Sequence, residues 1–133
     1  MGGFSNYLEN KVADHVLGGS DFTRPATVYV ALYTATPTDS GGGTELSGGG
    51  YARATMTNNS TSWPASSSGL KRNGVAITFP TASASWGTVV AFGIFDASSG
   101  GNLLVWGELD VAKSVESGDT PSFGISALQF QLD

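Results

Sequence analysis

Hydrophobic residues recur at nearly every fourth position within residues 4–17, and this period predicts a helix. Ser5 or Gly3 is suited to cap the start of this helix. The Gly18-Gly19 pair is suited to end it, because glycine tolerates the left-handed backbone that follows many helices. The hydrophobic residues of this helix form one apolar stripe, which consists of Phe4, Tyr7, Leu8, Val12 and Val16. This stripe must be buried either on the rest of its own chain or on a neighbouring subunit.

After Pro25 the spacing of hydrophobic residues changes to the alternation that is typical of strands. Residues 27–34 are rich in β-branched and aromatic residues, and both faces of this stretch are apolar, which predicts a strand covered on both sides. Residues 88–95 and 103–109 flank a turn rich in glycine and serine, and they form the clearest hairpin. Further short strands are predicted at residues 51–57, 70–79, 112–115, 123–125 and 128–132.

Two stretches rich in glycine, serine and threonine, residues 37–50 and 58–69, separate the early strands. Their composition predicts long exposed loops that do not pack a core. One helix followed by seven to nine short strands predicts a mainly β fold, most simply a jelly-roll-like β-sandwich with one N-terminal α-helix. We therefore expect a helical arm over residues 1–19 and a single sandwich domain over residues 20–133.

Composition excludes several kinds of protein. The chain has 133 residues, which predicts one domain, and no cysteine, which excludes disulfides and thiolate metal sites. The longest apolar runs are shorter than the roughly 18 residues of a membrane-spanning helix, so no membrane partner is expected. With six Lys and Arg and a net charge of −5, the chain has no basic stripe, so no nucleic-acid partner is expected. Only 13% of residues are charged, and such a surface favours contacts with partner proteins.

The sequence contains no convincing catalytic or cofactor site. His15 is the only histidine and stands among polar residues of the predicted helix, so a Ser-His-Asp triad is not expected. Glu108 and Asp110 share one face of a strand and leave a glycan-active enzyme as a remote alternative. The glycine runs lack the lysine of a phosphate-binding loop. We expect no enzyme, no cofactor and no metal.

Aromatic and apolar side chains are the better candidates for function. Trp86 and Trp106 lie at or in strands and are expected in a core or an interface. Trp63 stands before Pro64 in a loop, and both an exposed contact and a core position remain open for it. The candidate partner contacts are Phe4, Tyr7, Leu8, Val12, Tyr51 and Trp63.

Nearly the whole chain resembles a family of small virion proteins of tailed phages. The resemblance is carried by motifs that are typical of a fold rather than of catalysis. These motifs are GFSNYLENK (3–11) with DHV (14–16), PATVYVALYT (25–34) with PTD (37–39), GGGYAR (48–53), FPTA (79–82) with SWGTV (85–89), GIFDA (93–97) through GGNLL (100–104), and SGD (117–119).

This resemblance implies a structural role in a phage particle. Members of the family are often labelled tail-fibre proteins, and the size and expected architecture are also similar to those of the cement proteins that decorate phage heads. The resemblance to cement proteins implies a homodimer or homotrimer on the outer surface of the head that clamps neighbouring major capsid protein subunits. The alternative is a tail or tail-fibre component that contacts host surface sugars through Trp63 and Tyr51. In either role the protein is made in the host cytoplasm.

Overall fold

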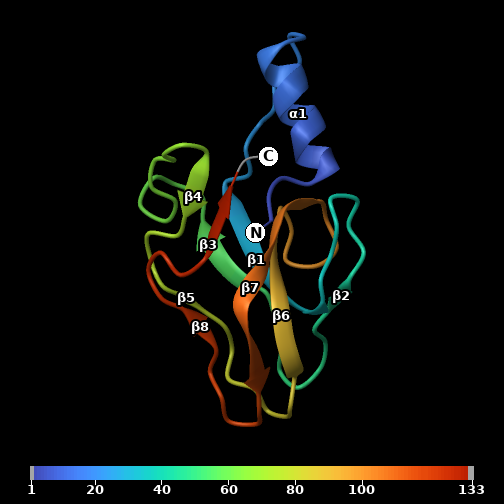
Figure 1. The fold of residues 1–133 in the computed structure, drawn as a ribbon, viewed down its shortest axis with the longest axis vertical. Coiled ribbons are helices and arrows are strands. Elements are labelled where there is room, and N and C mark those ends of the chain that lie inside the picture. The colour runs from blue at the N-terminus through green and yellow to red at the C-terminus, as the bar shows by residue number, and fades with distance from the viewer. Residues whose placement is uncertain (1, 132–133) are drawn as a thin grey trace.

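A single helix, α1 (Asn6–Val16), stands at one end of the molecule in the computed structural model, which describes residues 2–131 (Figure 1). Ser5 caps it as the sequence predicts, and its side-chain oxygen accepts a hydrogen bond of 3.2 Å from the Leu8 backbone N–H. The helix starts two residues later than expected, because residues 3–5 run extended along a strand. No helix among the described residues has the length and apolar character needed to span a membrane.

The largest sheet is antiparallel and has five strands. Its central strand β1 (Thr27–Ala35) pairs on one side with β6 (Gly87–Phe95), which in turn pairs with β7 (Leu103–Val115). On its other side β1 pairs with two short strands, β3 (Ala54–Thr57) near its start and β2 (Thr44–Glu45) near its end. The predicted hairpin of residues 88–95 and 103–109 is therefore the β6–β7 pair.

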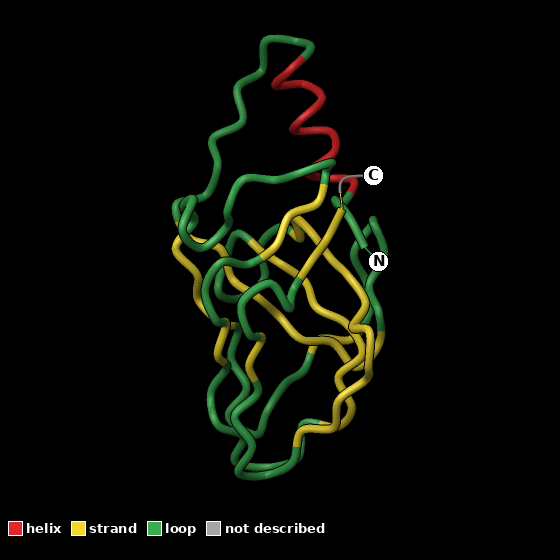
Figure 2. The backbone as a smooth tube through the Cα atoms, turned by 60° about the vertical axis from the view of Figure 1, so that its left-hand side comes forward, coloured by secondary structure: helices red, strands yellow, loops and turns green. Residues whose placement is uncertain are grey.

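Two antiparallel ribbons complete the strands. They are β4 (Leu70–Arg72) with β9 (Gln129–Gln131), and β5 (Ile77–Thr78) with β8 (Ser122–Phe123). Figures 1 and 2 show these ribbons running beside the larger sheet. Phe123 of β8 has its ring 6.3 Å from that of Phe92 on β6, so the β5–β8 ribbon packs its aromatic side chains against the sheet. The mainly β fold with one N-terminal helix is confirmed, and its antiparallel sheets are consistent with a β-sandwich; the jelly-roll arrangement stays a prediction.

Both faces of β1 are covered, as its pattern predicts. Val28, Val30 and Leu32 face the main core, where they pack with residues from β3, β5, β6 and β7. Ala31 and Tyr33 face the other side, in a smaller cluster with Ala91 and Phe95 of β6. The apolar run of β1 therefore serves two separate packing layers.

The segment before the helix lies along the outer edge of β7. The Ser5 N–H donates to the Leu104 carbonyl at 2.8 Å, and the Trp106 N–H donates to the Gly3 carbonyl at 3.1 Å. A Cβ on Gly2 would collide with the backbone of Trp106, so glycine is needed for this close approach. These contacts fix the position from which α1 leaves the sheet.

The expectation that residues 37–50 form a loop without core contacts is wrong. The stretch contains β2, and Leu46 is only 7% exposed and belongs to the main core. Pro37 is also fully buried. Several glycines here have positive φ, and the turns they permit bring the few apolar residues of the stretch back to the sheet.

Other boundaries also differ from the sequence prediction. The strand expected at residues 51–57 starts only at Ala54, and the one expected at 70–79 is divided into β4 and β5 around the buried Asn73. The separate strand at 112–115 is instead the end of β7, which continues through a bulge. Leu132, in the predicted last strand, lies outside the described residues.

Candidate partner-binding surface

The apolar stripe of the helix is only partly used by its own chain. Leu8 is buried in the main core, and Phe4, Tyr7 and Val12 are partly buried against it. The last turn extends beyond these contacts, since Val16 is 67% exposed and Leu17, which follows the helix, is 85% exposed. The first two turns thus pack on the chain itself, and the tip presents apolar side chains to solvent.

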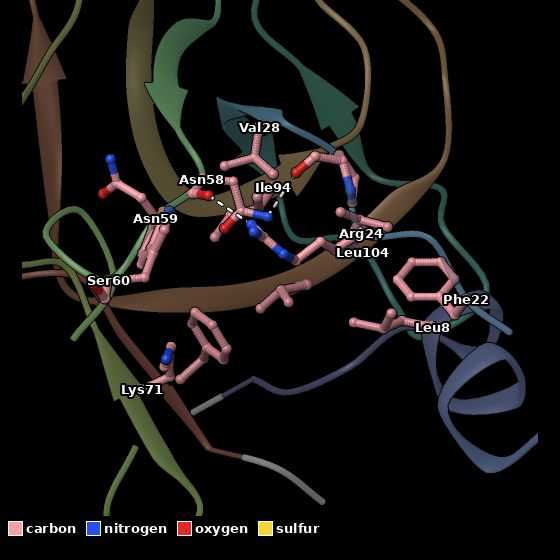
Figure 3. Close-up of a pocket in the computed structure, with 14 residues that line it drawn as sticks. Leu8, Phe22, Arg24, Val28, Asn58, Asn59, Ser60, Lys71, Ile94 and Leu104 are labelled. Carbon is pink, nitrogen blue, oxygen red and sulfur yellow. Dashed lines mark hydrogen bonds between the residues drawn. The ribbon is translucent and has the colours of Figure 1, made fainter. Parts of the chain in front are cut away.

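A cavity of about 620 Å³, here called the helix-base pocket, opens where α1 meets the strands (Figure 3). Apolar side chains from several elements form its wall, namely Leu8, Phe22, Val28, Ile94, Leu104, Trp63 and Phe130. Polar and basic side chains also line it, namely Arg24, Asn58, Asn59, Ser60 and Lys71. Figure 3 shows Leu8 and Phe22 on the helix side and Lys71 across the pocket from them.

The charge lining this pocket has one sign. Arg24 and Lys71 are two of the six basic residues of the chain, and among residues 2–131 no Asp or Glu lines the pocket. The Arg24 guanidinium donates a hydrogen bond of 2.8 Å to the Asn58 carbonyl, which holds it across the cavity. Among residues 2–131 neither cation has a carboxylate within ion-pair distance. In a chain with a net charge of −5, the pocket is a local positive site.

A tight turn places Trp63 in the wall of the pocket. The Asn59 side-chain oxygen accepts hydrogen bonds from the N–H groups of Thr61 and Ser62, at 3.0 and 2.9 Å. The Asn59 carbonyl then accepts from the Trp63 N–H, so the chain turns inward. Trp63 is 7% exposed, with its ring centroid 6.4 Å from that of Phe130. The sequence left open whether Trp63 is an exposed contact or a core residue, and the structure places it in the core.

The Trp63 indole Nε1 is buried and has no hydrogen-bond partner among the described residues. A buried donor without an acceptor costs about 1–3 kcal/mol. The donor belongs to a residue of the helix-base pocket, which already contains Arg24 and Lys71. Because this nitrogen is buried from solvent, the charged donors that a partner can meet in the pocket are those of Arg24 and Lys71.

A second polar site, on the other side of β1, is built for rigidity. Arg53 makes two parallel bonds to Glu45, with Nη2–Oε1 at 2.8 Å and Nε–Oε2 at 2.9 Å. Its remaining nitrogen donates to the carbonyls of Ala97 and Gly100, and its guanidinium lies 3.7 Å from the centroid of the Phe95 ring. One side chain thus connects β2, the segment before β3 and the β6–β7 turn.

Tyr51 connects this network to the backbone of β1 through its hydroxyl group. Its hydroxyl donates to Glu45 at 2.7 Å and accepts from the Leu32 N–H at 3.1 Å. Its ring meets Trp86 edge-on at 5.4 Å, and the Trp86 indole N–H donates to the Gly49 carbonyl at 2.8 Å. The GGGYAR motif at 48–53 therefore organises the fold, and its three glycines have the positive φ that the turn requires.

These contacts shift the titration of the groups involved. Burial alone would raise the pKa of Glu45, but the hydrogen bonds from Arg53 and Tyr51 outweigh it and hold the pKa below its ordinary value. Burial raises the pKa of Tyr33 to about 12, and the nearby Glu45 charge adds to the effect. Burial and the hydrogen bond to Glu45 also raise the pKa of Tyr51. Glu45 is therefore ionised and both tyrosines are neutral near pH 7.

The structure does not bring the six candidate contacts together: Phe4, Tyr7 and Val12 pack partly buried against the main core, and the other three lie in the two sites. Leu8 and Trp63 line the helix-base pocket, whereas Tyr51 belongs to the Glu45–Arg53 network. The pocket residues Phe22, Arg24 and Lys71 were missed by the sequence analysis. Phe22 is the one aromatic side chain between the helix and β1, and this was the available signal for it. As partner contacts, the six residues stay a prediction.

The residues considered for catalysis do not line the helix-base pocket and take no part in the Arg53 network. Glu108 and Asp110 are exposed on β7. His15 is half-exposed on α1, where its Nδ1 accepts a hydrogen bond of 3.1 Å from the Phe22 N–H. Within residues 2–131 no group of three His, Asp or Glu residues is placed to hold a metal ion. The chemistry available at the helix-base pocket is recognition by apolar contact, donated hydrogen bonds and positive charge.

Comparison with protein families gives a match over nearly the whole chain. The model of the family described as podophage GP4 fiber I protein gp80 matches residues 3–131. No curated protein sequence matches the chain. The matched region contains the helix, all the strands of the described residues and both sites.

Proposed function

Because the chain belongs to the family of podophage GP4 fiber I protein gp80, we propose that it is a non-enzymatic structural component of a phage fibre. Family membership supports the coarser statement, a structural role in the phage virion. The observation that carries the proposal is the extent of the match, which covers residues 3–131 rather than one short motif.

The geometry of the chain agrees with such a role. The Arg53–Glu45 pair and the buried side chain of Asn73 give a sheet whose loops are held by specific hydrogen bonds. These polar side chains hydrogen-bond to other parts of the same chain, so they stabilise the fold and are not available to bind a substrate. The exposed helix tip and the helix-base pocket remain as surfaces for partner proteins.

The family description favours the fibre alternative over the head-decoration role that the sequence analysis placed first. The description names a fibre protein and says nothing of a capsid. Under this proposal the partners are other fibre components, in place of the major capsid protein. Contact with the host surface is then a role of the assembled fibre.

Locating the protein in the particle tests the proposal. Antibodies against the full chain would be used for immunogold labelling of intact virions, and for blotting of heads and fibres separated after mild dissociation. We expect label on fibres and signal in the fibre fraction. An antibody against the major capsid protein serves as the control for the head fraction. Label confined to heads would overturn the proposal and restore the decoration role.

A further inference from the structure

The exposed end of α1 combines apolar side chains with negative charge. This helix tip, residues 14–21, contains Val16 and Leu17, which are 67% and 85% exposed. It also contains Asp14 and Asp21, and the Asp21 side chain is 97% exposed. The carbonyls that end a helix add partial negative charge at the same place. Lys11, one turn earlier, directs its ammonium group to the Tyr7 ring at 5.7 Å. Within the tip, the Asp21 carboxylate lies 3.9 Å from His15 Nδ1, which also accepts the Phe22 N–H. Apart from His15, the ionisable side chains of the tip are both acidic.

The helix-base pocket has the complementary properties. Its wall is apolar, and its two charged side chains are Arg24 and Lys71. Among the described residues no acid lines it. An acidic segment that carries exposed aliphatic side chains therefore fits this pocket in both charge and hydrophobicity.

The apolar end of the helix tip, Val16 and Leu17, cannot reach the pocket of its own chain. Leu8, near the start of α1, lines the pocket, and Leu17 follows the other end of the helix. At about 1.5 Å per residue these two residues are roughly 14 Å apart along the helix axis. Figure 1 shows the helix pointing away from the strands. A tip that enters such a pocket must therefore come from another molecule.

We propose that the helix tip of one copy docks in the helix-base pocket of a second copy of the same chain. Val16 and Leu17 lie against the apolar wall, and the two acids of the tip face Arg24 and Lys71. The docked surface removes the exposed aliphatic side chains from water and supplies the two cations with carboxylates. The inference does not rest on the fibre role, because it concerns only self-association of the chain.

The contact joins two different surfaces, so it is of the head-to-tail type. Each copy offers one tip and one pocket, and such contacts close into a ring or continue as a filament. In a twofold contact between identical patches, by contrast, a single substitution would alter both sides of the contact at once. This difference makes the proposal testable with single substitutions.

The first experiment measures self-association of the full chain by analytical ultracentrifugation at several concentrations. The wild type is expected to form oligomers, and Leu17→Asp to weaken association by about tenfold or more, since a buried leucine is replaced by a charge. Ile125→Asp is the matched control, because Ile125 is an exposed aliphatic residue in the β8–β9 connection, 68% exposed. It is expected to associate like the wild type.

The second experiment exchanges charge between the two surfaces. Asp14→Lys and Lys71→Glu are each expected to weaken association when studied alone. In an equimolar mixture, the altered tip of the first variant meets the altered pocket of the second, and the native tip meets the native pocket. The mixture is therefore expected to associate more strongly than either variant by itself. Circular dichroism of each variant verifies that the fold is retained.

Three results would overturn the proposal. One is a wild-type chain that stays monomeric at all concentrations measured. Another is an oligomer that Leu17→Asp leaves unchanged, or that Ile125→Asp weakens equally. The third is an equimolar mixture that associates no better than the separate variants. The oligomeric state does not depend on where the protein lies in the virion, so failure here leaves the fibre proposal standing.

Discussion

The guanidinium of Arg53 binds both carboxylate oxygens of Glu45, at 2.8 and 2.9 Å, and its side chain is only 7% exposed. The same guanidinium bonds the carbonyls of Ala97 and Gly100, which belong to the turn between β6 and β7. This pair therefore connects two loops that are more than forty positions apart in the sequence.

Removal of Arg53 is expected to destabilise the fold. Arg53→Ala leaves Glu45 without its charged partner and two turn carbonyls without a donor, and should lower the free energy of unfolding by about 2–3 kcal/mol. Arg53→Lys keeps the charge but loses the paired geometry, and should fall between wild type and alanine. Urea unfolding measures both. Arg72→Ala, an exposed control, should change stability by less than about 0.5 kcal/mol; an equal loss there would contradict the assignment.

Acid should remove the contribution of Glu45. Its pKa in the folded state lies below the ordinary value of 4.5, so the unfolded state takes up its proton first as the pH falls. The stabilisation is therefore complete above about pH 4.5, and is lost as the pH falls through the lower folded pKa. Urea unfolding at pH values from about 6 down to about 2.5 measures this, with Glu45→Gln for comparison. The stability difference between the two chains should shrink with acid; a constant difference would contradict the prediction.

Asn73 is expected to be the most sensitive polar residue of the core. It is fully buried, and its side chain donates to the carbonyls of Val75 and Gly124 and accepts from the Leu128 N–H, at 2.8–3.0 Å. Asn73→Ala leaves these groups unpaired and should cost about 2–4 kcal/mol of unfolding free energy. Asn73→Asp places a carboxylate opposite two carbonyls and should cost more at neutral pH than at acidic pH. Thermal unfolding at both pH values distinguishes the two variants.

Gly2 should govern the attachment of the N-terminal segment. A Cβ at this position meets the Trp106 backbone, so Gly2→Ala should displace residues 2–5 from the edge of β7 and lower stability by about 1–3 kcal/mol. Hydrogen exchange at the amides of Ser5 and Trp106 measures the displacement directly. Gly124→Ala is the control, because a Cβ there has no neighbour within 4 Å. Unchanged exchange in Gly2→Ala would show that the segment is held by other contacts.

Local pattern predicted the elements whose residues lie close in sequence. The four-residue period located α1 with its Ser5 cap, and the continuous apolar run of β1 indicated that both its faces are covered. Composition gave the wrong prediction for stretches in which one or two residues decide whether the chain is buried. One leucine among many glycines, Leu46, is enough to bring residues 37–50 back to the core, and one Asn turn buries Trp63.

The helix-base pocket could not be predicted in this way. Arg24 and Lys71 are 47 positions apart, and only the pairing of β4 with β9 and of β1 with β3 brings their segments to one cavity. Nothing in the local pattern near Lys71 indicates a pocket. The Arg53 network is similar, since its acceptors Ala97 and Gly100 come from a distant turn.

The edge of β7 bears on solubility at high local concentration. Residues 3–5 cover its first half, whereas its second half has no strand partner among the described residues. There the strand bulges, with Val90 of β6 facing residues 109–112, and it carries Glu108, Asp110 and Lys113. Bulges and charges on an open edge prevent another sheet from pairing with it. Copies of the chain held close together, as subunits of one particle are, therefore meet at this edge a surface that opposes edge-to-edge pairing of their sheets.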